Sequence, residues 1–494
     1  MRHLFLWHRW LGIGLCLFMA LWFVSGIVML FVGYPKLTAT EHLQSLPDLS
    51  SQQDYIDVDE ALSVTGKTSS PSSIRLSSIA NTPVFLFMFP EEGMAAVNAN
   101  TGELIDSVSP QQALLSANQF NKTAETEYIG LVDKDAWTQS SALNPERPLH
   151  VIKLNDAAQR LIYISSHTGR IVRDATLNER RWGWLGAWLH WIYPLRSMPW
   201  WADMIIYLSL TATIMAMLGQ YLGIKRWRFS STYRSGSHSP YRSGFARWHH
   251  IAGLVFGVFL IAWIFSGMMS MRPWNLLANQ SQLPISEFSA GPLAPVNSPL
   301  SISDVLARFE SAHFQPTELA WHRVAGQMWL SALNIQGESQ VLPLFGDNTV
   351  STQIPFLTLK NTVNTLSPNI NKQFEWLTAY DFYYYGRDEQ SMYGNRTRPL
   401  PLLRVTFADN AQTWWHINPA NGEVIESVDQ QRRLARWLFN LLHSWDWQPL
   451  LERPWLRQIL IIGFSLGGLM ISISGVVMGW RRLRGTKKRK RKSA

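Results

Sequence analysis

The sequence predicts a membrane α-helical protein: four core transmembrane helices, arranged as a duplicated pair, with α+β domains outside the membrane. Three observations predict this fold class. Four apolar stretches are long enough to cross a hydrocarbon core, which takes about 20 helical residues. Two long polar segments, rich in Ser, Thr, Asn and Pro, separate the first stretch from the second and the third from the fourth. Short motifs recur in both halves at the same spacing.

The apolar stretches run over Trp10–Val32, Trp200–Ile224, His250–Met271 and Leu456–Trp480. The first is too long for the apolar core of a signal peptide and has no clear small-x-small cleavage site after it. We therefore expect it to be retained as a helix. Trp clusters precede the second and fourth stretches and are typical of a membrane-interface belt.

Basic residues predict the orientation. Lys225–Arg247 contains six Lys and Arg and no acid, and the chain after Trp480 is strongly basic. Such flanks stay in the cytoplasm, so both termini are expected there and both polar segments in the periplasm, across a bacterial inner membrane. The net charge of +9 thus indicates topology and contact with anionic lipid, and no nucleic-acid partner is expected.

These features predict eight consecutive units. They are transmembrane helix 1 (residues 1–33), a first periplasmic region (34–181), an interfacial helix with transmembrane helix 2 (182–226), a basic cytoplasmic loop (227–248), transmembrane helix 3 (249–272), a second periplasmic region (273–434), an interfacial helix with transmembrane helix 4 (435–481), and a basic cytoplasmic tail (482–494).

The first repeated motif opens the first and third helices. Trp7–Gly12 reads WHRWLG and Trp248–Gly253 reads WHHIAG. A second matching motif follows in each half, WFVSG in the first and WIFSG in the second. Ser25 stands as far after His8 as Ser266 stands after His249. Agreement without a gap indicates a duplication.

The second repeated motif lies before the second and fourth helices. Gly169 and Gly422, each in a turn between predicted strands, precede His190 and His443 by the same interval. Each histidine is followed by a Pro-Leu pair and a transmembrane stretch that ends in basic residues. Arg-Pro-Leu at 147–149 and at 398–400 opens matching strand-rich segments.

Alternating apolar residues predict strands in the outer regions, as in Pro83–Phe89 and Gln412–Ile417. The phrase Val97–Ile105, with Asn-Thr-Gly at its centre, predicts a tight turn between strands because glycine adopts positive φ without strain. A short helix is expected over Ile302–His313. An α+β outer domain, with two small modules in each half, fits this pattern.

His8 and His249 are therefore expected at the cytoplasmic ends of two helices, and His190 and His443 at the outer face. Two pairs of imidazoles from facing helices are what two b-type haems need as axial ligands. A lone histidine at a helix end is more often an interfacial residue, and the adjacent His250 leaves the register of one ligand open. The single cysteine, Cys16, excludes c-type haem attachment and cysteine-based metal centres.

The glycines near these histidines have two possible roles, and the sequence does not decide between them. They would let either a porphyrin or a neighbouring helix approach closely, and packing glycines are common in membranes. The residues concerned are Gly12, Gly14, Gly26, Gly253, Gly257 and Gly267.

The motifs HRWLG, WFVSG, the late Thr-Gly-Arg or Asn-Gly-Glu turn and the downstream Leu-His together resemble the PepSY-associated transmembrane family. The resemblance covers nearly the whole chain and is to the iron-regulated inner-membrane proteins and ferric-siderophore reductases of that family. It implies periplasmic PepSY domains and two haems b with His8, His249, His190 and His443 as axial ligands. The aromatic stretch Asp381–Tyr385 and the large outer segments depart from the family pattern, which leaves the chelate open.

The function expected from this resemblance is electron transfer outward through the two haems to a ferric siderophore or other iron chelate. No dinucleotide or flavin fingerprint occurs, so the electron donor is expected to be a quinol or a separate reductase. No catalytic residue is assigned. The alternative is a non-enzymatic PepSY module that binds or inhibits a peptidase or senses an envelope ligand. A permease is disfavoured because the spans carry few charged residues.

Overall fold

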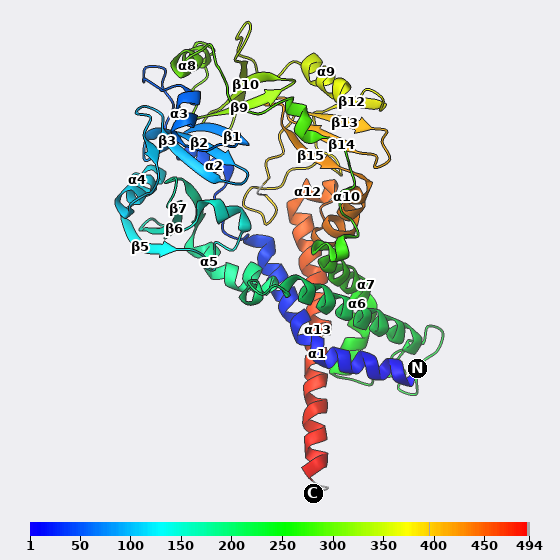
Figure 1. The fold of residues 1–494 in the computed structure, drawn as a ribbon. Coiled ribbons are helices and arrows are strands. Elements are labelled where there is room, and N and C mark those ends of the chain that lie inside the picture. The colour runs from blue at the N-terminus through cyan, green and yellow to red at the C-terminus, as the bar shows by residue number, and fades with distance from the viewer. Residues whose placement is uncertain (395, 492–494) are drawn as a thin grey trace.

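The computed structural model describes residues 1–394 and 396–491, with side chains described as far as residue 485. The end of the predicted basic tail, residues 492–494, lies outside the described residues. The molecule has a helical part that carries both chain ends and a β-rich part at the opposite end of the helices (Figure 1).

Four helices of the described chain are long and apolar enough to cross a membrane. Each begins close to the predicted start, and α1 and α7 begin early enough to include His8 and His249. Their bounds are Arg2–Phe31 for α1, Trp201–Arg226 for α6, Phe245–Ser270 for α7 and Pro454–Arg491 for α13, of which Pro454–Gly485 is the candidate span.

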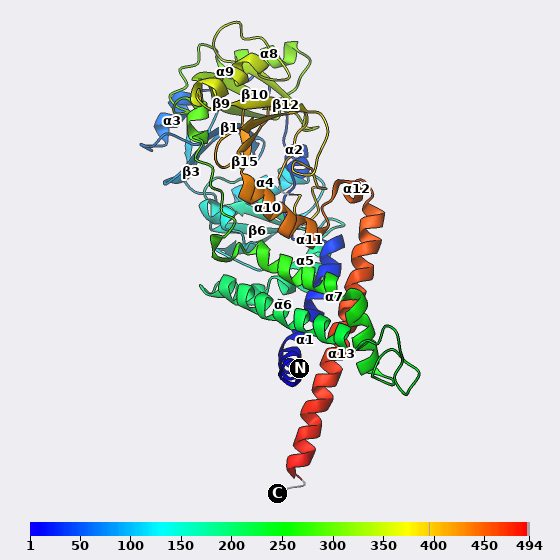
Figure 2. The same ribbon diagram turned by 90° about the vertical axis from the view of Figure 1, so that its right-hand side faces the viewer.

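The four helices pack as a bundle in which α1 and α7 each contact both α6 and α13 (Figure 2). Met19, Phe23 and Leu260 are buried at its centre. Two glycines of α13 allow close approach: a Cβ at Gly467 would lie 2.3 Å from the ring of Phe256, and one at Gly468 the same distance from Phe23. Small residues at such crossings are typical of helices that pack in lipid.

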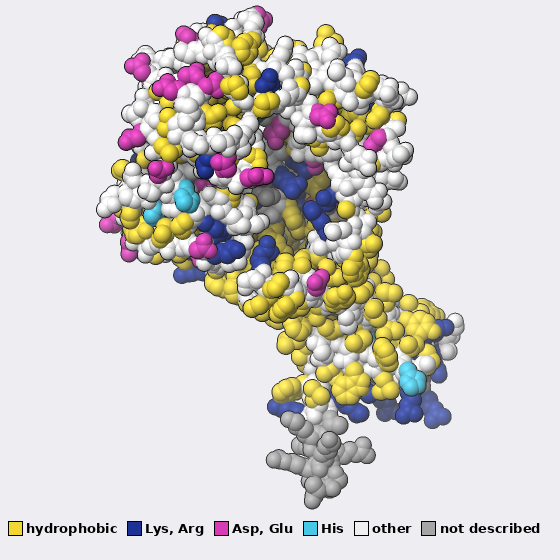
Figure 3. Space-filling model, viewed as in Figure 1, with side chains coloured by type: hydrophobic (Ala, Val, Ile, Leu, Met, Phe, Trp, Pro, Cys, Tyr) yellow, Lys and Arg dark blue, Asp and Glu magenta, His cyan; other side chains and the backbone are white. Residues whose placement is uncertain are grey.

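The surface of the bundle is a continuous hydrophobic band, bounded by Lys and Arg at the end away from the β-sheets (Figure 3). Large apolar side chains such as Leu17, Ile214 and Val258 are exposed on it. An apolar helix surface of this extent is stable in hydrocarbon and not in water. The chain is therefore a membrane protein with β-sheet domains.

A seven-stranded antiparallel sheet joins the two outer regions. Strand β1 of the first region pairs with β9 of the second, with Arg75 opposite Ala320 and Leu76 opposite Leu319. Both sides of this join contribute to one hydrophobic core. The sheet order is β11-β10-β9-β1-β2-β3-β4, with bounds Ser73–Ile79 (β1), Thr82–Phe89 (β2), Gly93–Asn98 (β3), Leu104–Ile105 (β4), Glu318–Val324 (β9), Gln327–Leu333 (β10) and Ser339–Pro343 (β11).

Each outer region also has a four-stranded antiparallel sheet covered by one helix, α4 (Pro110–Phe120) or α9 (Phe356–Leu366). Register shifts fall at Tyr163/Ile164 in one sheet and His416/Ile417 in the other. The strands are Thr126–Val132 (β5), Leu149–Leu154 (β6), Leu161–Ser165 (β7) and Ile171–Ala175 (β8), and Lys372–Leu377 (β12), Leu402–Phe407 (β13), Trp414–Ile417 (β14) and Val424–Val428 (β15).

The predicted turns form at Gly102, Gly169 and Gly422, whose φ values are +74°, +76° and +74°. One sequence match was out of register. Strand β6 begins at Leu149 but its counterpart β13 begins at Leu402, so Leu149 corresponds to Leu402 and not to Leu400. The error arose because Pro-Leu occurs twice in succession at 399–402, and the sequence alone does not distinguish the two copies.

Short helices complete the outer regions and the approach to the bundle. The helix predicted over 302–313 is α8, Ile302–Ser311, which begins at a capping box made by Ser301 and Asp304. The others are α2 (Ala39–Gln44), α3 (Val58–Val64), α5 (Leu177–Gly183), α10 (Gln430–Ala435), α11 (Leu442–Ser444) and α12 (Gln448–Leu451), with 3₁₀ turns at Ser141–Glu146, Tyr193–Leu195, Pro273–Asn275 and Ile285–Ser289.

Candidate functional site

The four histidines singled out in the sequence form two facing pairs. The rings of His8, on α1, and His249, on α7, have centres 6.2 Å apart and planes tilted by 48°. The rings of His190 and His443, which lie shortly before α6 and α13, are also 6.2 Å apart, with planes at 68°. The structure thus brings together the members of each predicted pair.

Trp22 and Ser25, one turn apart on α1, hold His190. The indole Nε1 of Trp22 donates to the backbone oxygen of His190 at 3.1 Å, and Nδ1 of His190 lies 2.9 Å from Oγ of Ser25. The Ser25 hydroxyl donates its only proton to the carbonyl of Trp22 at 3.0 Å. The imidazole must therefore be the donor in the bond to Ser25, and His190 carries its proton on Nδ1.

Trp263 and Ser266, on α7, hold His443 in the same way. The indole of Trp263 donates to the backbone oxygen of His443 at 3.1 Å, Nδ1 of His443 lies 3.1 Å from Oγ of Ser266, and that hydroxyl donates to the carbonyl of Trp263 at 3.0 Å. Because the Ser266 hydroxyl donates to this carbonyl, it accepts from the imidazole, and His443 carries its proton on Nδ1.

The other pair is held by backbone oxygens of the neighbouring helices. Nδ1 of His8 donates to the carbonyl of Met215 on α6, and Nδ1 of His249 donates to the carbonyl of Ile471 on α13, both at 3.0 Å. The hydroxyl of Ser474 also accepts from His249 at 2.9 Å while donating to Ile471. A carbonyl oxygen only accepts, so these rings too carry the proton on Nδ1.

All four rings therefore present Nε2 with its lone pair, and no described residue forms a hydrogen bond with these Nε2 atoms. Two imidazoles on opposite sides of one metal ion, with metal–nitrogen bonds of about 2 Å and roughly 1 Å more to each ring centre, have centres about 6 Å apart. Both pairs have that separation. A donated Nδ1 proton is also the usual way in which a protein orients a metal-binding imidazole.

One glycine faces each ring. A Cβ at Gly219 would lie 2.5 Å from Cε1 of His8, and one at Gly475 would lie 3.7 Å from Cε1 of His249. At Gly26 and Gly267 the corresponding distances to His190 and His443 are 3.8 and 3.4 Å. Of the glycines noted in the sequence, Gly26 and Gly267 thus lie at the site, whereas Gly14 and Gly253 have no atom within 4 Å of a Cβ.

His250, the alternative to His249, has a different environment. Its Nδ1 lies 2.8 Å from Oγ of Ser239 and its Nε2 lies 2.9 Å from the carbonyl oxygen of Gly223. Both ring nitrogens are thus occupied in fastening the loop between α6 and α7. The geometry therefore favours His249 over His250 as a metal ligand.

Irregular backbone sets the position of the outer pair. A π-helical turn, Trp184–Trp188, precedes His190, and another, Arg436–Leu441, precedes His443. Two residues after each histidine the backbone is left-handed, at Ile192 (φ 52°) and Trp445 (φ 53°). π-helical turns and non-glycine residues at positive φ concentrate at functional sites because other interactions must stabilise them.

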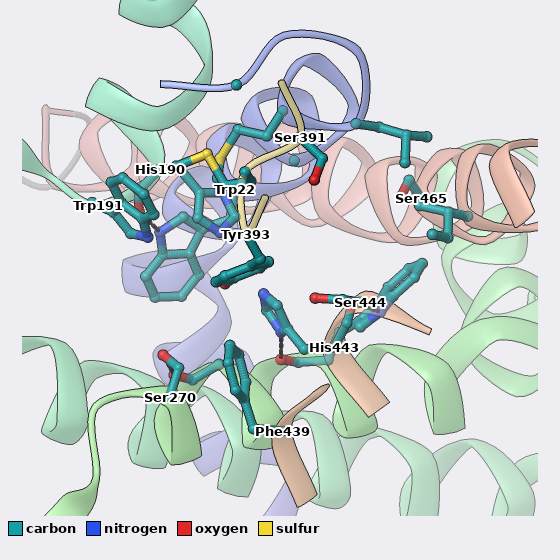
Figure 4. Close-up of a pocket in the computed structure, with 18 of the residues that line it drawn as sticks. Trp22, His190, Trp191, Ser270, Ser391, Tyr393, Phe439, His443, Ser444 and Ser465 are labelled. Atoms are coloured by element: carbon teal, nitrogen blue, oxygen red, sulfur yellow. Dashed lines mark hydrogen bonds between the residues drawn. The ribbon is translucent and has the colours of Figure 1, made fainter. Parts of the chain in front are cut away.

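His190 and His443 open into a cavity of about 500 Å³ at the outer end of the bundle, large enough for a small-molecule ligand (Figure 4). The apolar side chains of Met19, Phe23 and Ile264 line its deep part. Residues of segment 386–393, from the second outer region, also line the cavity. This segment is bound to the chain that follows α1, because Lys36 Nζ donates to the carbonyl of Ser391 at 2.6 Å. The cavity thus lies between the membrane helices and the outer domains.

Four residues that hold the outer imidazoles were not predicted from the sequence: Trp22, Ser25, Trp263 and Ser266. The signal was present, because these residues form the repeated words WFVSG and WIFSG. Their partners lie 165 to 180 residues away in the chain. Spacing within each motif therefore gave no indication that its Trp and Ser contact the second histidine of the same half.

Comparison with known proteins agrees with these features. The model of one protein family, described as the PepSY-associated TM region, matches residues 5–356. That segment includes α1, α6 and α7 and three of the four histidines. No curated protein matches the chain. Because the matched segment covers well over half of the sequence, the chain belongs to the PepSY-associated transmembrane family.

Proposed function

We propose that this protein is a di-haem b-type electron-transfer protein of the bacterial inner membrane that reduces a ferric siderophore in the periplasm. The observation that carries the proposal is the matched geometry of the two histidine pairs. The ring centres of each pair have the separation expected of two imidazoles on one metal, and both rings keep Nε2 free. A tetrapyrrole would supply the other four ligands of six-coordinate iron. His8 and His249 would hold the inner haem, and His190 and His443 the outer one.

The positions of the pairs support transfer across the bilayer. Ser25, which binds His190, belongs to the same helix as His8. At a rise of about 1.5 Å per residue, the stretch of α1 from His8 to Ser25 is about 25 Å long. A hydrocarbon core is about 30 Å thick, so the pairs would lie near its opposite faces.

The proposed orientation follows from charge. Lys and Arg side chains of the loop between α6 and α7 and of the C-terminal end of the α13 span lie at the end of the helices away from the β-sheets (Figure 3). With these in the cytoplasm, both termini are cytoplasmic and the sheets periplasmic. The equivalent contacts of Trp22, Ser25, Trp263 and Ser266 support two halves that arose by internal duplication.

The bound haems would supply one-electron chemistry, and the chain supplies position and environment. Ser25 and Ser266 fix the outer imidazoles. Apolar side chains of the bundle line the cavity together with segment 386–393 of the second outer region. Reduction to Fe(II) weakens binding by the hard oxygen donors of a siderophore, and iron is released. A quinol or a separate reductase would supply the electrons.

The absorption spectrum of the protein purified in detergent tests this proposal. We expect two bis-histidine haems b per chain, reducible by dithionite and reoxidised by a ferric siderophore. His8→Ala and His443→Ala should each remove one haem, whereas His250→Gln should retain both because His250 has no free ring nitrogen. A colourless protein that captures a peptidase would instead support a non-enzymatic PepSY module.

A further inference from the structure

One wall of the outer cavity is basic. Arg387 and Arg457 line it, and both bind one carboxylate: Nη1 of Arg387 lies 2.5 Å, and Nη2 of Arg457 3.6 Å, from Oδ1 of Asp446. The Asp446 side chain is only 1% exposed. The other charged residue of the lining, Asp388, is exposed to solvent.

A third guanidinium joins this group. Nη2 of Arg436 donates to the backbone oxygen of Asp446 at 2.5 Å, and its Nη1 lies 3.0 Å from the hydroxyl of Tyr385, which in turn donates to Oδ2 of Asp446 at 3.0 Å. Two guanidinium groups thus contact one buried carboxylate, and the third reaches it through the hydroxyl of Tyr385. Buried charge is costly unless it is compensated, so this wall favours an anionic ligand.

Part of the donor capacity of the wall is unused. Arg457 donates through Nε and Nη2 to the carbonyl of Ser444, at 3.0 and 2.6 Å, and Arg387 donates through Nη1 to Asp446. No described residue accepts from Nη1 of Arg457 or from Nη2 of Arg387. Both guanidinium groups line the cavity, where planar paired N–H groups suit a carboxylate.

The basic wall belongs to one half only. Counted from the paired histidines, the position of Arg436 corresponds to Gly183 in the first half, and that of Asp446 corresponds to Tyr193. The two sides of the cavity therefore offer matching imidazoles but different charge. Haem b has the same asymmetry: its faces are alike to an axial ligand, while both of its carboxylates lie on one edge.

We propose that Arg387 and Arg457, positioned by Asp446, bind the carboxylates on one edge of the outer haem. This inference rests on the proposed function. The duplicated imidazoles would fix the iron, and the unpaired basic wall would fix the rotation of the ring about its axis. Asp446 is a positioning residue, since it holds both guanidinium groups toward the cavity.

The test uses Arg387→Gln, Arg457→Gln and Asp446→Asn in the full chain, with Arg457→Lys as the conservative variant. Resonance Raman bands of the haem carboxylates and the midpoint potential are measured in a His8→Ala background, where only the outer haem is expected. Each Arg→Gln variant should shift the carboxylate bands, lower the midpoint potential and weaken haem retention about tenfold. Asp446→Asn, which removes a negative charge, should raise the potential.

Arg453→Gln is the matched control, because Arg453 is exposed one turn before Arg457 and its side chain donates to the backbone of Pro449. Carboxylate bands and potential equal to this control in both Arg→Gln variants would overturn the inference, even with both haems present in the parent protein. Loss of a bound phospholipid in native mass spectra, with unchanged haem bands, would assign the wall to a lipid headgroup instead. Absence of haem from the parent would overturn this inference and the proposed function together.

Discussion

Nδ1 of His190 lies 2.9 Å from Oγ of Ser25, a residue 165 positions earlier in the chain. The Ser25 hydroxyl already donates to the carbonyl of Trp22, so it can only accept from the imidazole. One serine thereby selects the tautomer of the ring and leaves Nε2 free. The same relation between Ser266 and His443 makes the outer pair equivalent on both sides.

Replacing either serine tests this relation. Ser25→Ala and Ser266→Ala leave Nδ1 of the paired histidine without its hydroxyl acceptor, which loosens the ring and makes the tautomer with a free Nε2 less favourable. Loss of such an outer contact typically costs about 10–100-fold in ligand affinity. We expect the outer haem to be lost on dilution in detergent, as measured by the pyridine haemochrome. Thr211→Ala, which removes an exposed hydroxyl bonded within α6, should retain both haems.

Glycine at 219 is required by the inner pair. An alanine Cβ there would lie 2.5 Å from Cε1 and 3.1 Å from Nδ1 of His8, so the ring must shift from the position in which it binds the carbonyl of Met215. We expect Gly219→Ala to retain one haem per chain, with the spectrum of the outer site unchanged. In Gly14→Ala the new methyl group meets no atom within 4 Å. That variant should therefore keep both haems, and loss of haem from it would contradict the steric explanation.

Glu318 should make the joined sheet sensitive to acid. Burial alone would raise its pKa, but the hydrogen bond with His42 at 3.1 Å and the charge of Arg75 at 2.9 Å outweigh burial and lower the pKa to about 2. The folded pKa is thus below the unfolded value of 4.5. The stability that Glu318 contributes is present above pH 4.5 and is lost as the pH falls toward 2.

Glu318→Gln should therefore destabilise the sheet at neutral pH by about 1–3 kcal/mol, since Arg75 and His42 lose the buried carboxylate that they bind. Hydrogen exchange of the backbone amides in β1 and β9 measures this effect. After correction for the pH dependence of intrinsic exchange, it should be faster in the variant than in the parent. The difference from the parent should shrink between pH 4.5 and 2. Glu91→Gln, in an exposed turn, should exchange like the parent at every pH.

Asp174 should have the opposite pH dependence. Its side chain is 2% exposed, its Oδ1 has no hydrogen-bond partner among the described residues, and burial raises its pKa to about 8. Between pH 3.8 and 8 the folded state keeps a proton that the unfolded state has lost, so stability falls as the pH rises. Asp174→Asn should remove this slope and slow exchange in β8 at pH 8. Asp106→Asn, at an exposed position, should leave the slope unchanged.

The helices and the histidine pairs were predictable from the sequence because their signals are local. Apolar length marks a span, and the duplicated words placed His8 with His249 without any alignment of relatives. The role of Ser25 was not predictable, since a short motif does not state which distant residue it contacts. The cluster of Asp446 with Arg387, Arg436 and Arg457 was not predicted because it has no counterpart in the other half. Comparison of the two halves reveals only residues that are repeated.

The join between β1 and β9 was also out of reach. Both strands are short and mix apolar with polar residues. Nothing in either identifies a partner about 240 residues away, the separation spanned by the Arg75–Glu318 ion pair. Alternating residues predict that a strand exists, whereas its neighbours in a sheet are set by the three-dimensional arrangement. The two outer regions were consequently predicted as separate units, with no indication that one sheet connects them.

This join has a consequence for how the protein is made. During synthesis β1 is complete long before β9 exists, and at roughly 5–20 residues per second the interval of about 240 residues lasts on the order of 10–50 s. Throughout that time the edge of β1 is an unpaired template for aggregation. The sheet cannot be completed until α6, α7 and β9 have been synthesised, so the two halves of the chain mature together.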